Sequence, residues 1–447
     1  MESNVQGCAD ELTELLLNRG KSFCGITITG CIMTYIEEDS MKCKAVYIGN
    51  FSPSKMDAQT QLVIGNSRIL RELGMDVTLI CNDKDMVMDS EAFHHGNIEG
   101  FECYSLRFSK SLKGLLNSVE MFSQVKNILD KLNAREIAYV FCYGSIGFAN
   151  QLLMLSDWCK KNHVQIIANC VDLPDVNHGN MVERIVKKLD RAIRYHAMEI
   201  RMDGMIAVSR YIQELFAQKS SYPIAVIPPL KDTQEMERHD FAPRNNVKKI
   251  VYVGVPFPID GRKVDESAYK DRIDLFIDLL CAAACKDWRL DIYGITKEQY
   301  SRVVTCQQPL LARYQKQIVF HGRIGHEKAL RIVADADYTV VYRLKNRMTM
   351  AGFSTKFVES ISCGTPVIMT DTSEYSKYVE NGVPSIILDL QDETHRKKAL
   401  EHALMKTPQE MMEMKEKCRA SHVFDYRQYI EPMREFLAQV DSESAKG

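Results

Sequence analysis

The chain has 447 residues, which exceeds what one hydrophobic core usually holds and suits two domains. Its apolar content of 45% and charged content of 26% are typical of a globular protein, and a net charge of −2 argues against a nucleic-acid partner. The 14 cysteines form no C-x-x-C pair, and several stand inside apolar runs, as expected for buried thiols in a reducing compartment. No apolar run reaches the ~20 residues that span a bilayer, and residues 1–20 do not resemble a signal peptide. We therefore expect a cytoplasmic protein.

Regular alternation of strands and helices begins only after residue 43, so residues 1–43 are interpreted as an N-terminal extension. A strand is expected at 45–49, a helix at 59–73 and a second strand at 76–81. Short apolar strands alternating with helices predict a parallel sheet covered on both faces. Ligands of such sheets bind at the carboxyl ends of the strands. Asn50 and Asp57, in the polar loop after the first strand, are therefore candidate cleft residues, with an ordinary surface loop as the alternative.

Two segments of the first half combine basic and apolar residues. The first spans 105–132. The second is a helix expected at 182–203, in which basic residues recur three and four positions apart, namely Arg184, Lys187, Arg191 and Arg194. Such helices suit either an anionic membrane surface, for example at the inner face of a membrane, or solvent.

Asp172 directly follows a strand expected at 164–171, with His178 later in the same loop. A carboxylate at the carboxyl end of a parallel strand projects into the ligand crevice. Asp172 is thus a candidate catalytic residue, and His178 a candidate cleft residue. The alternative for Asp172, held to be equally good, is a helix or turn cap.

Residues 231–247 are polar and are interpreted as a linker between a first domain at 44–230 and a second at 248–422. In the second domain, Gly254 ends the first strand and Lys270 opens the following helix, where a lysine is electrostatically misplaced unless it binds an anion. Arg323 and Arg343 each follow a later strand. Arg343 is a candidate ligand of a phosphate or of a sugar acid.

The most informative stretch is MAGFSTKFVESISCGTPVIMT, residues 350–370. It predicts a loop, a helix over about 355–363, a turn at Gly364 and a buried strand at 367–369. Ser354 or Thr355 is expected to cap this helix, whose N-terminus offers free N–H groups to a phosphate. Gly352 allows close approach of the backbone, and Lys356 adds a positive charge. Glu359, one turn further on, is placed to accept hydrogen bonds from a vicinal diol.

This stretch resembles the nucleotide-sugar motif of family four glycosyltransferases, whose GT-B fold has two doubly wound Rossmann-like domains facing each other across a cleft. Glu359 matches the second Glu of that motif, which holds the ribose of the donor. Ala351 stands where the family has its first Glu, which touches the transferred sugar. The resemblance implies a donor site comprising Gly352, Phe353, Ser354, Thr355, Lys356 and Glu359, with Lys270 and Gly254 at the diphosphate and the backbone from Arg323 at the base. Arg262 and Lys263 are rivals to Lys270.

The resemblance further implies sugar transfer from a nucleotide diphosphate sugar to a glycan or lipid-linked hydroxyl, with retained anomeric configuration and without a metal or other cofactor. It implies a role in bacterial surface polysaccharides and a terminal segment, 423–447, that packs back on the first domain. Two alternatives stay open. One is a non-hydrolysing nucleotide-sugar epimerase of the same fold. The other is a non-catalytic sugar-nucleotide-binding subunit of a transferase, with Ala351 marking lost catalysis.

Overall fold

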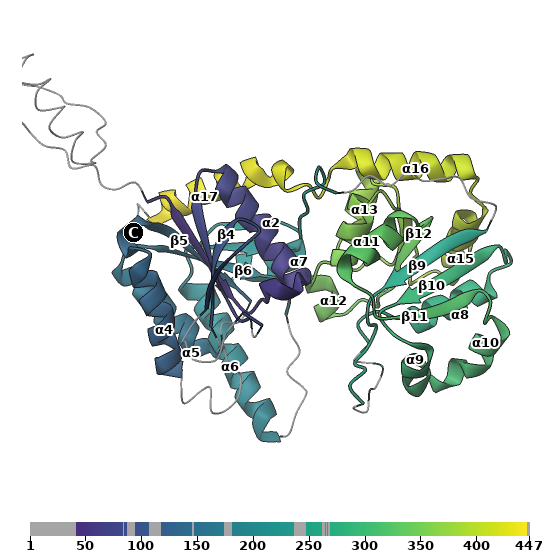
Figure 1. The fold of residues 1–447 in the computed structure, drawn as a ribbon, viewed down its shortest axis with the longest axis horizontal. Coiled ribbons are helices and arrows are strands. Elements are labelled where there is room, and N and C mark those ends of the chain that lie inside the picture. The colour runs from purple at the N-terminus through teal and green to yellow at the C-terminus, as the bar shows by residue number, and fades with distance from the viewer. Residues whose placement is uncertain are drawn as a thin grey trace, which may run out of the picture.

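The computed structural model describes residues 42–83, 85–86, 94–106, 118–144, 147–173, 181–236, 247–261, 264, 266 and 269–444. Two α/β domains lie side by side, and helices of the C-terminal segment run along both of them (Figure 1). Each domain is built on a largely parallel sheet flanked by helices. The predicted class, two Rossmann-like α/β domains, is confirmed.

The first domain has an eight-stranded sheet in the order β3-β4-β2-β1-β5-β6-β7-β8. Its strands are β1 (Lys44–Gly49), β2 (Asp76–Cys81), β3 (His94–Ile98), β4 (Phe101–Ser105), β5 (Ile137–Tyr143), β6 (Gln165–Cys170), β7 (Gly204–Ala207) and β8 (Ile224–Val226). Its helices are α2 (Ala58–Glu72), α4 (Ser118–Lys131), α5 (Ala149–Lys161), α6 (Met181–Ile200) and α7 (Arg210–Ala217). The hairpin of β3 and β4 is antiparallel and was not predicted.

The second domain has a six-stranded sheet in the order β11-β10-β9-β12-β13-β14. Its strands are β9 (Lys248–Val253), β10 (Trp288–Tyr293), β11 (Ile318–Gly322), β12 (Tyr338–Val341), β13 (Val367–Met369) and β14 (Ile386–Ile387). Its helices are α8 (Ile273–Ala282), α9 (Lys297–Val303), α10 (Gln308–Arg313), α11 (His326–Ala334), α12 (Arg347–Ala351), α13 (Thr355–Ser362), α14 (Tyr375–Glu380), α15 (Glu393–Met405) and α16 (Pro408–Ser421).

The central strands are mostly apolar, as expected for strands whose two faces are both covered by helices. In β1, residues 45–49 are all buried. Inside this core, the Tyr47 hydroxyl donates to Asn169 Oδ1 at 2.7 Å, and Asn66 Nδ2 donates to the Tyr47 oxygen at 3.0 Å. These hydrogen bonds tie β1, β6 and α2 together and satisfy polar groups that would be unfavourable if left unpaired.

Three boundaries differ from those predicted. The helix after Lys270 begins at Ile273 instead. The loop expected before residue 352 contains the short helix α12, which the Asn346 side chain caps by accepting from Thr349 N at 2.9 Å. Of the basic segment 105–132, residues 107–117 lie outside the described residues, and α4 starts at Ser118.

The end of the chain returns to the first domain through a 3-10 helix, η5 (Tyr426–Tyr429), and α17 (Ile430–Ser444). Met433, Phe436, Leu437 and Val440 are buried in the core of the first domain. The packing is close at Gly204, because a Cβ there would lie 2.7 Å from Val440 Cγ2.

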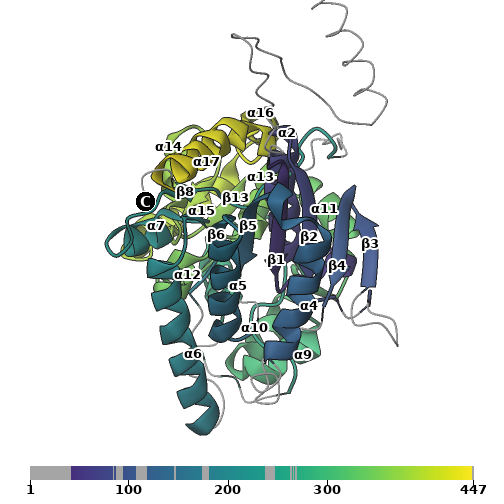
Figure 2. The same ribbon diagram turned by 90° about the vertical axis from the view of Figure 1, so that its left-hand side faces the viewer.

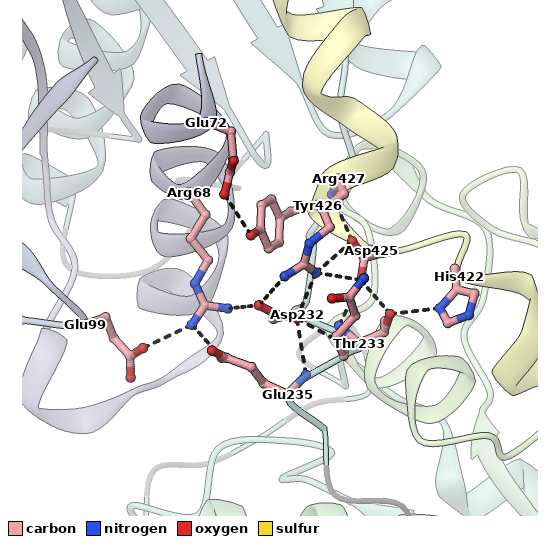
Figure 3. A network of polar contacts seen from close by, with 11 residues as sticks. Arg68, Glu72, Glu99, Asp232, Thr233, Glu235, His422, Asp425, Tyr426 and Arg427 are labelled. Carbon is pink, nitrogen blue, oxygen red and sulfur yellow. Dashed lines mark hydrogen bonds and ion pairs between the residues drawn. The ribbon is translucent and has the colours of Figure 1, made fainter. Parts of the chain in front are cut away.

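A polar network joins α2, the start of the interdomain segment and η5 (Figure 3). Arg427 donates to both oxygens of Asp232, at 2.9 and 3.0 Å, and Arg68 lies 3.7 Å from the same carboxylate. Burial alone would raise the pKa of Asp232, but the hydrogen bonds from Arg427 and from backbone amides lower it below its ordinary value. The domain connection therefore depends on a buried carboxylate between two arginines.

We expect Asp232→Asn to lower the free energy of unfolding by about 2 kcal/mol, because the two arginines lose a buried charged partner. The matched control is Glu235→Gln, since Glu235 also pairs with Arg68 but its side chain is 70% exposed. This change should cost no more than about 0.5 kcal/mol. Because the pKa of Asp232 is lowered, the difference should be complete above about pH 4 and disappear at lower pH. Urea unfolding measures both, and equal losses in the two variants would contradict this account.

Candidate functional site

A buried carboxylate, Asp271, gathers basic side chains at the carboxyl end of the second sheet. Its oxygens accept from Lys356 Nζ at 2.6 Å, from Arg343 Nε at 2.7 Å and from the Tyr252 hydroxyl at 2.8 Å. Asp271 precedes α8, Arg343 follows β12 and Lys356 lies in the first turn of α13. One carboxylate thereby fixes the positions of three elements around a common point.

The charges of this cluster favour the binding of an anion. Burial by itself would raise the pKa of Asp271, but Lys356 and Arg343 hold it well below its ordinary value. Lys270 stands beside them, and its pKa falls to about 8, mainly because protein atoms crowd the ammonium group and also because Lys356 and Arg343 are positive. More than a third of the residue is still open to solvent. Three cations thus face a single buried carboxylate, and an incoming anion would relieve their mutual repulsion.

Gly254 makes room for this arrangement. Its φ of +151° is unusual for a residue with a side chain, and a Cβ there would lie 2.5 Å from Lys356 Cε. Gly294, at the end of β10, approaches so closely that a Cβ would lie 2.3 Å from the Gly254 carbonyl oxygen. Glycine at both positions keeps the strand ends free of side chains beside the lysine.

The start of α13 differs from the prediction in its details. Ser354 occupies the N-cap position, but its side chain does not cap the helix. Its Oγ is instead a buried atom without a hydrogen-bond partner, and its amide donates to the Tyr375 hydroxyl at 3.0 Å. Neighbouring Thr355 is half-buried. An unpaired buried hydroxyl at a helix N-terminus suits a ligand that completes its hydrogen bonding.

Two other residues predicted to bind the donor, Phe353 and Gly352, make contacts within the protein. The Phe353 ring packs among Phe357, Tyr375, Tyr378 and Phe424, which leaves its backbone as the part able to meet a ligand. Gly352 has a φ of −78°, which any residue adopts, so the predicted use of glycine there rests on close approach of a ligand and not on backbone conformation. Its carbonyl accepts from Ser373 Oγ.

Glu359 lies where the two domains meet. Lys231 Nζ, from the interdomain segment, is 3.1 Å from Glu359 Oε1 and also contacts Gln61 of α2. His326 Nε2 lies 2.7 Å from Gln61 Nε2 and 4.0 Å from Glu359 Oε1. Gln61, Lys231 and His326 line a pocket of about 400 Å³ between α2, the interdomain segment and α11. The carboxylate therefore contacts residues that line an interdomain cavity and has a lysine as its partner.

Ala351 is completely buried and belongs to the core of the first domain. Its carbonyl accepts from Ser209 Oγ at 2.7 Å, and α12 packs against α7. The position equivalent to the first motif Glu is thus an interdomain contact.

The remaining predicted residues of the first domain are spread around the same edge. Asp172 follows β6 and is exposed. Nearby Tyr143 has a raised pKa, mainly because Tyr143 is itself buried and also because of the negative charge of Asp172. The same charge acts on Lys270 across the domain boundary, so the two lie within electrostatic range. Asn50 accepts from Asn82 Nδ2 at 2.8 Å. Asp57 caps α2 by accepting from Thr60 N at 3.0 Å, a structural role that was not predicted for it.

Arg323 is exposed directly after β11. Three of the sequence-based candidates, His178, Arg262 and Lys263, lie outside the described residues. Sequence reasoning missed Asp271 and Lys231. Asp271 adjoins Lys270 and carried no signal of its own, whereas Lys231 was included in the linker for its polarity.

Residues 261–406 match a family model described as glycosyl transferases group 1, which covers much of the second domain. A search of curated proteins gave no match.

Solved structures share the fold at low sequence identity. Sucrose-phosphate synthase from Thermosynechococcus elongatus has 15% identity and a TM-score of 0.59, and covers 89% of this chain and 100% of its own. Anabaena HepE in complex with UDP has 14% identity and a TM-score of 0.58 over 88% and 99% of the two chains. The trehalose 6-phosphate synthase of Burkholderia multivorans has 11% identity and a TM-score of 0.57 over 91% and 100%. The GT-B fold is confirmed, and with the domain match it supports a glycosyltransferase.

In the part of the chain that the structure describes, no helix is both long and apolar enough to cross a membrane. No group of three or more His, Cys, Asp and Glu side chains in that part of the chain is arranged to hold a metal ion.

We expect Asp271→Asn to destabilise the protein by about 3 kcal/mol, because it leaves Lys356 and the buried Arg343 without their shared counter-charge. The control is Glu393→Gln, which breaks an exposed pair with Lys397 on α15 and should leave the stability unchanged within the error of the measurement. Chemical unfolding of both variants measures the difference. A loss below 1 kcal/mol for Asp271→Asn would show that the carboxylate does not hold the cluster together.

Proposed function

We propose that this protein is a family four glycosyltransferase that moves a sugar from a nucleotide diphosphate sugar to a hydroxyl group of a glycan or lipid-linked acceptor. The donor binds to the second domain, and the acceptor reaches the first domain at the edge where Asp172 lies. The observation that carries this proposal is the pairing of Lys356 and Arg343 with Asp271 at the carboxyl end of the second sheet, with Lys270 within electrostatic range of all three.

The roles follow from the chemistry of a diphosphate. Taken out of water, it needs cations or N–H donors to replace its hydration. Lys270, Lys356 and the backbone of residues 352–355 supply these groups, while Arg343 holds Asp271 in place. The same cations take the part of a metal ion in neutralising the leaving group, so the reaction needs no metal or other cofactor.

Glu359 binds the ribose hydroxyls once Lys231 moves aside, and the backbone from Arg323 meets the base. Asp172 orients the acceptor hydroxyl or stabilises positive charge on the sugar. The leaving diphosphate takes the acceptor's proton, and the anomeric configuration is retained. UDP is the first nucleotide to test, because structures of Anabaena HepE contain UDP and UDP-glucose. The surrounding pathway is bacterial surface-polysaccharide synthesis, on the cytoplasmic side of the membrane.

One observation favours a second candidate, a non-catalytic sugar-nucleotide-binding subunit. Ala351 is buried between the domains, so no carboxylate reaches the transferred sugar from that position in this arrangement. Hydrolysis of the donor in the absence of acceptor would argue against this candidate.

An epimerase would instead need acid–base groups that act on the sugar itself. Its activity would appear as conversion of one nucleotide sugar into another without any acceptor.

The proposal predicts which nucleotide stabilises the protein. A cognate nucleoside diphosphate at about 100 times its dissociation constant should add about 2.7 kcal/mol of stability. Thermal shift with UDP, GDP, dTDP and ADP measures this on the wild type and on Glu359→Ala, which should lose most of the shift. Glu431→Ala, at an exposed position on α17, is the control. If no nucleotide shifts the wild type, the donor site is wrong.

Affinity should also depend on pH through Lys270. Its pKa is about 8, so it is positive below that pH and neutral above it. We expect affinity for the cognate nucleotide sugar to fall about 5- to 10-fold as the pH rises from 7 to 9, because one charge-assisted contact is lost. Titration calorimetry at constant ionic strength measures the fall. Lys270→Gln should bind weakly at all pH values with a flat profile, while Lys316→Gln, at an exposed lysine near α10, should keep the wild-type profile.

A further inference from the structure

Helix α6 exposes a row of large apolar side chains. Met181, Val182, Ile185, Leu189 and Ile193 are 48–70% exposed, although residues of this kind are usually buried. Their spacing of three and four residues places them on one face of the helix. At 1.5 Å per residue the row is about 18 Å long. This is a continuous apolar surface and not a set of scattered residues.

The described contacts that hold the helix to the domain begin at its midpoint, where Asp190 Oδ1 accepts from the Ala149 amide at 2.6 Å, and continue through its C-terminal half. Ala197 and Met198 are buried there, and Arg194 donates to the Gly147 carbonyl at 2.9 Å. The predicted basic stripe is therefore wrong at Arg194, which is buried and pairs with Asp190 at 3.2 Å. The N-terminal half projects beyond the sheet and its neighbouring helices, as Figures 1 and 2 show.

Basic residues flank the apolar row on this projecting half. Arg184, Lys187 and Lys188 are all exposed. Over residues 181–200 the helix has five Lys and Arg residues against three Asp and Glu residues, although the whole chain has a net charge of −2. An apolar face bordered by cations is complementary to a layer of acyl chains covered by anionic headgroups.

We propose that the N-terminal half of α6 docks on the surface of a membrane that contains anionic lipids. The apolar row enters the boundary between headgroups and acyl chains, and the three exposed cations contact the headgroups. The same cations disfavour a second copy of this chain as the occupant, because pairing two α6 helices would bring two positive surfaces together.

Docking would also place the candidate site at the membrane. Asp172 lies close enough to α6 for its charge to act on Tyr195 of that helix, whose pKa is raised to about 12, mainly by burial. If the proposed function holds, a lipid-linked acceptor anchored in the same membrane would meet Asp172 without leaving the bilayer. This last step rests on the proposed function, whereas the docking itself does not.

The test is co-sedimentation of the full chain with vesicles of phosphatidylcholine alone and with 30% phosphatidylglycerol. We expect at least 10-fold tighter partitioning to the anionic vesicles. The double change Ile185→Ser and Leu189→Ser, and the double change Arg184→Gln and Lys188→Gln, should each weaken partitioning about 10-fold or more. Val119→Ser, at a residue 70% exposed on α4, and Lys160→Gln with Lys161→Gln, on α5, are the matched controls and should bind like the wild type.

Circular dichroism and nucleotide-induced thermal shift on the same samples separate this test from that of the proposed function. Partitioning that is equally weak to both vesicle types, or that the controls lose as strongly as the α6 variants, would overturn the proposal. A concentration-dependent dimer that is abolished by the Ile185 and Leu189 changes, without vesicle binding, would assign the surface to a second copy and overturn it as well. Binding that fails while the nucleotide shift remains would leave the transferase proposal intact.

Discussion

The candidate site depends on one buried ionic contact, that of Asp271 with Lys356 and Arg343. Removing a carboxylate from water costs several kcal/mol, and this cost is offset only when its partners are close and correctly oriented. The partners come from positions separated by up to 85 residues in the chain. The contact therefore fixes the ends of β9 and β12 and the start of α13 relative to one another. A diphosphate would meet cations already held in place, which reduces the loss of side-chain entropy on binding.

A second set of contacts connects this site to the arrangement of the domains. Glu359, the predicted ribose ligand, is paired with Lys231, and Lys231 also exchanges backbone hydrogen bonds with Phe424 and Tyr426 where the chain crosses back to the first domain. A ribose that binds Glu359 would compete with this lysine. Under the proposed function, donor binding and the position of the interdomain segment are then linked, because the same side chain takes part in both.

Sequence patterns predicted the elements whose signals are local. Apolar runs located β1, β2 and β6 to within a residue, and the Gly364 turn after residues 355–362 was correct because a helix stop needs only neighbouring residues. Asp271 could not be recognised, since its role arises from a tertiary contact with Arg343 and Lys356. The side-chain cap predicted for Ser354 is absent for the same reason. Its buried Oγ has no hydrogen-bond partner among the described residues, and its amide donates to the Tyr375 hydroxyl, which is distant in sequence. Glu359 was chosen through the family motif, and the structure shows that Lys231 and His326 lie next to its carboxylate.

Ala351 shows how a substitution in a motif depends on the packing around it. It is fully buried and clusters with the core residues of the first domain, and Ser209 donates a hydrogen bond to its carbonyl. A carboxylate side chain there would be buried beside apolar groups, at a cost of several kcal/mol unless it ionised in contact with a cation. The close packing of α12 against α7 and a glutamate at position 351 are thus incompatible in this domain arrangement. If the sugar is transferred here, its contacts come from other groups or from a different relative position of the two domains, and Ala351 is the residue that permits the arrangement described.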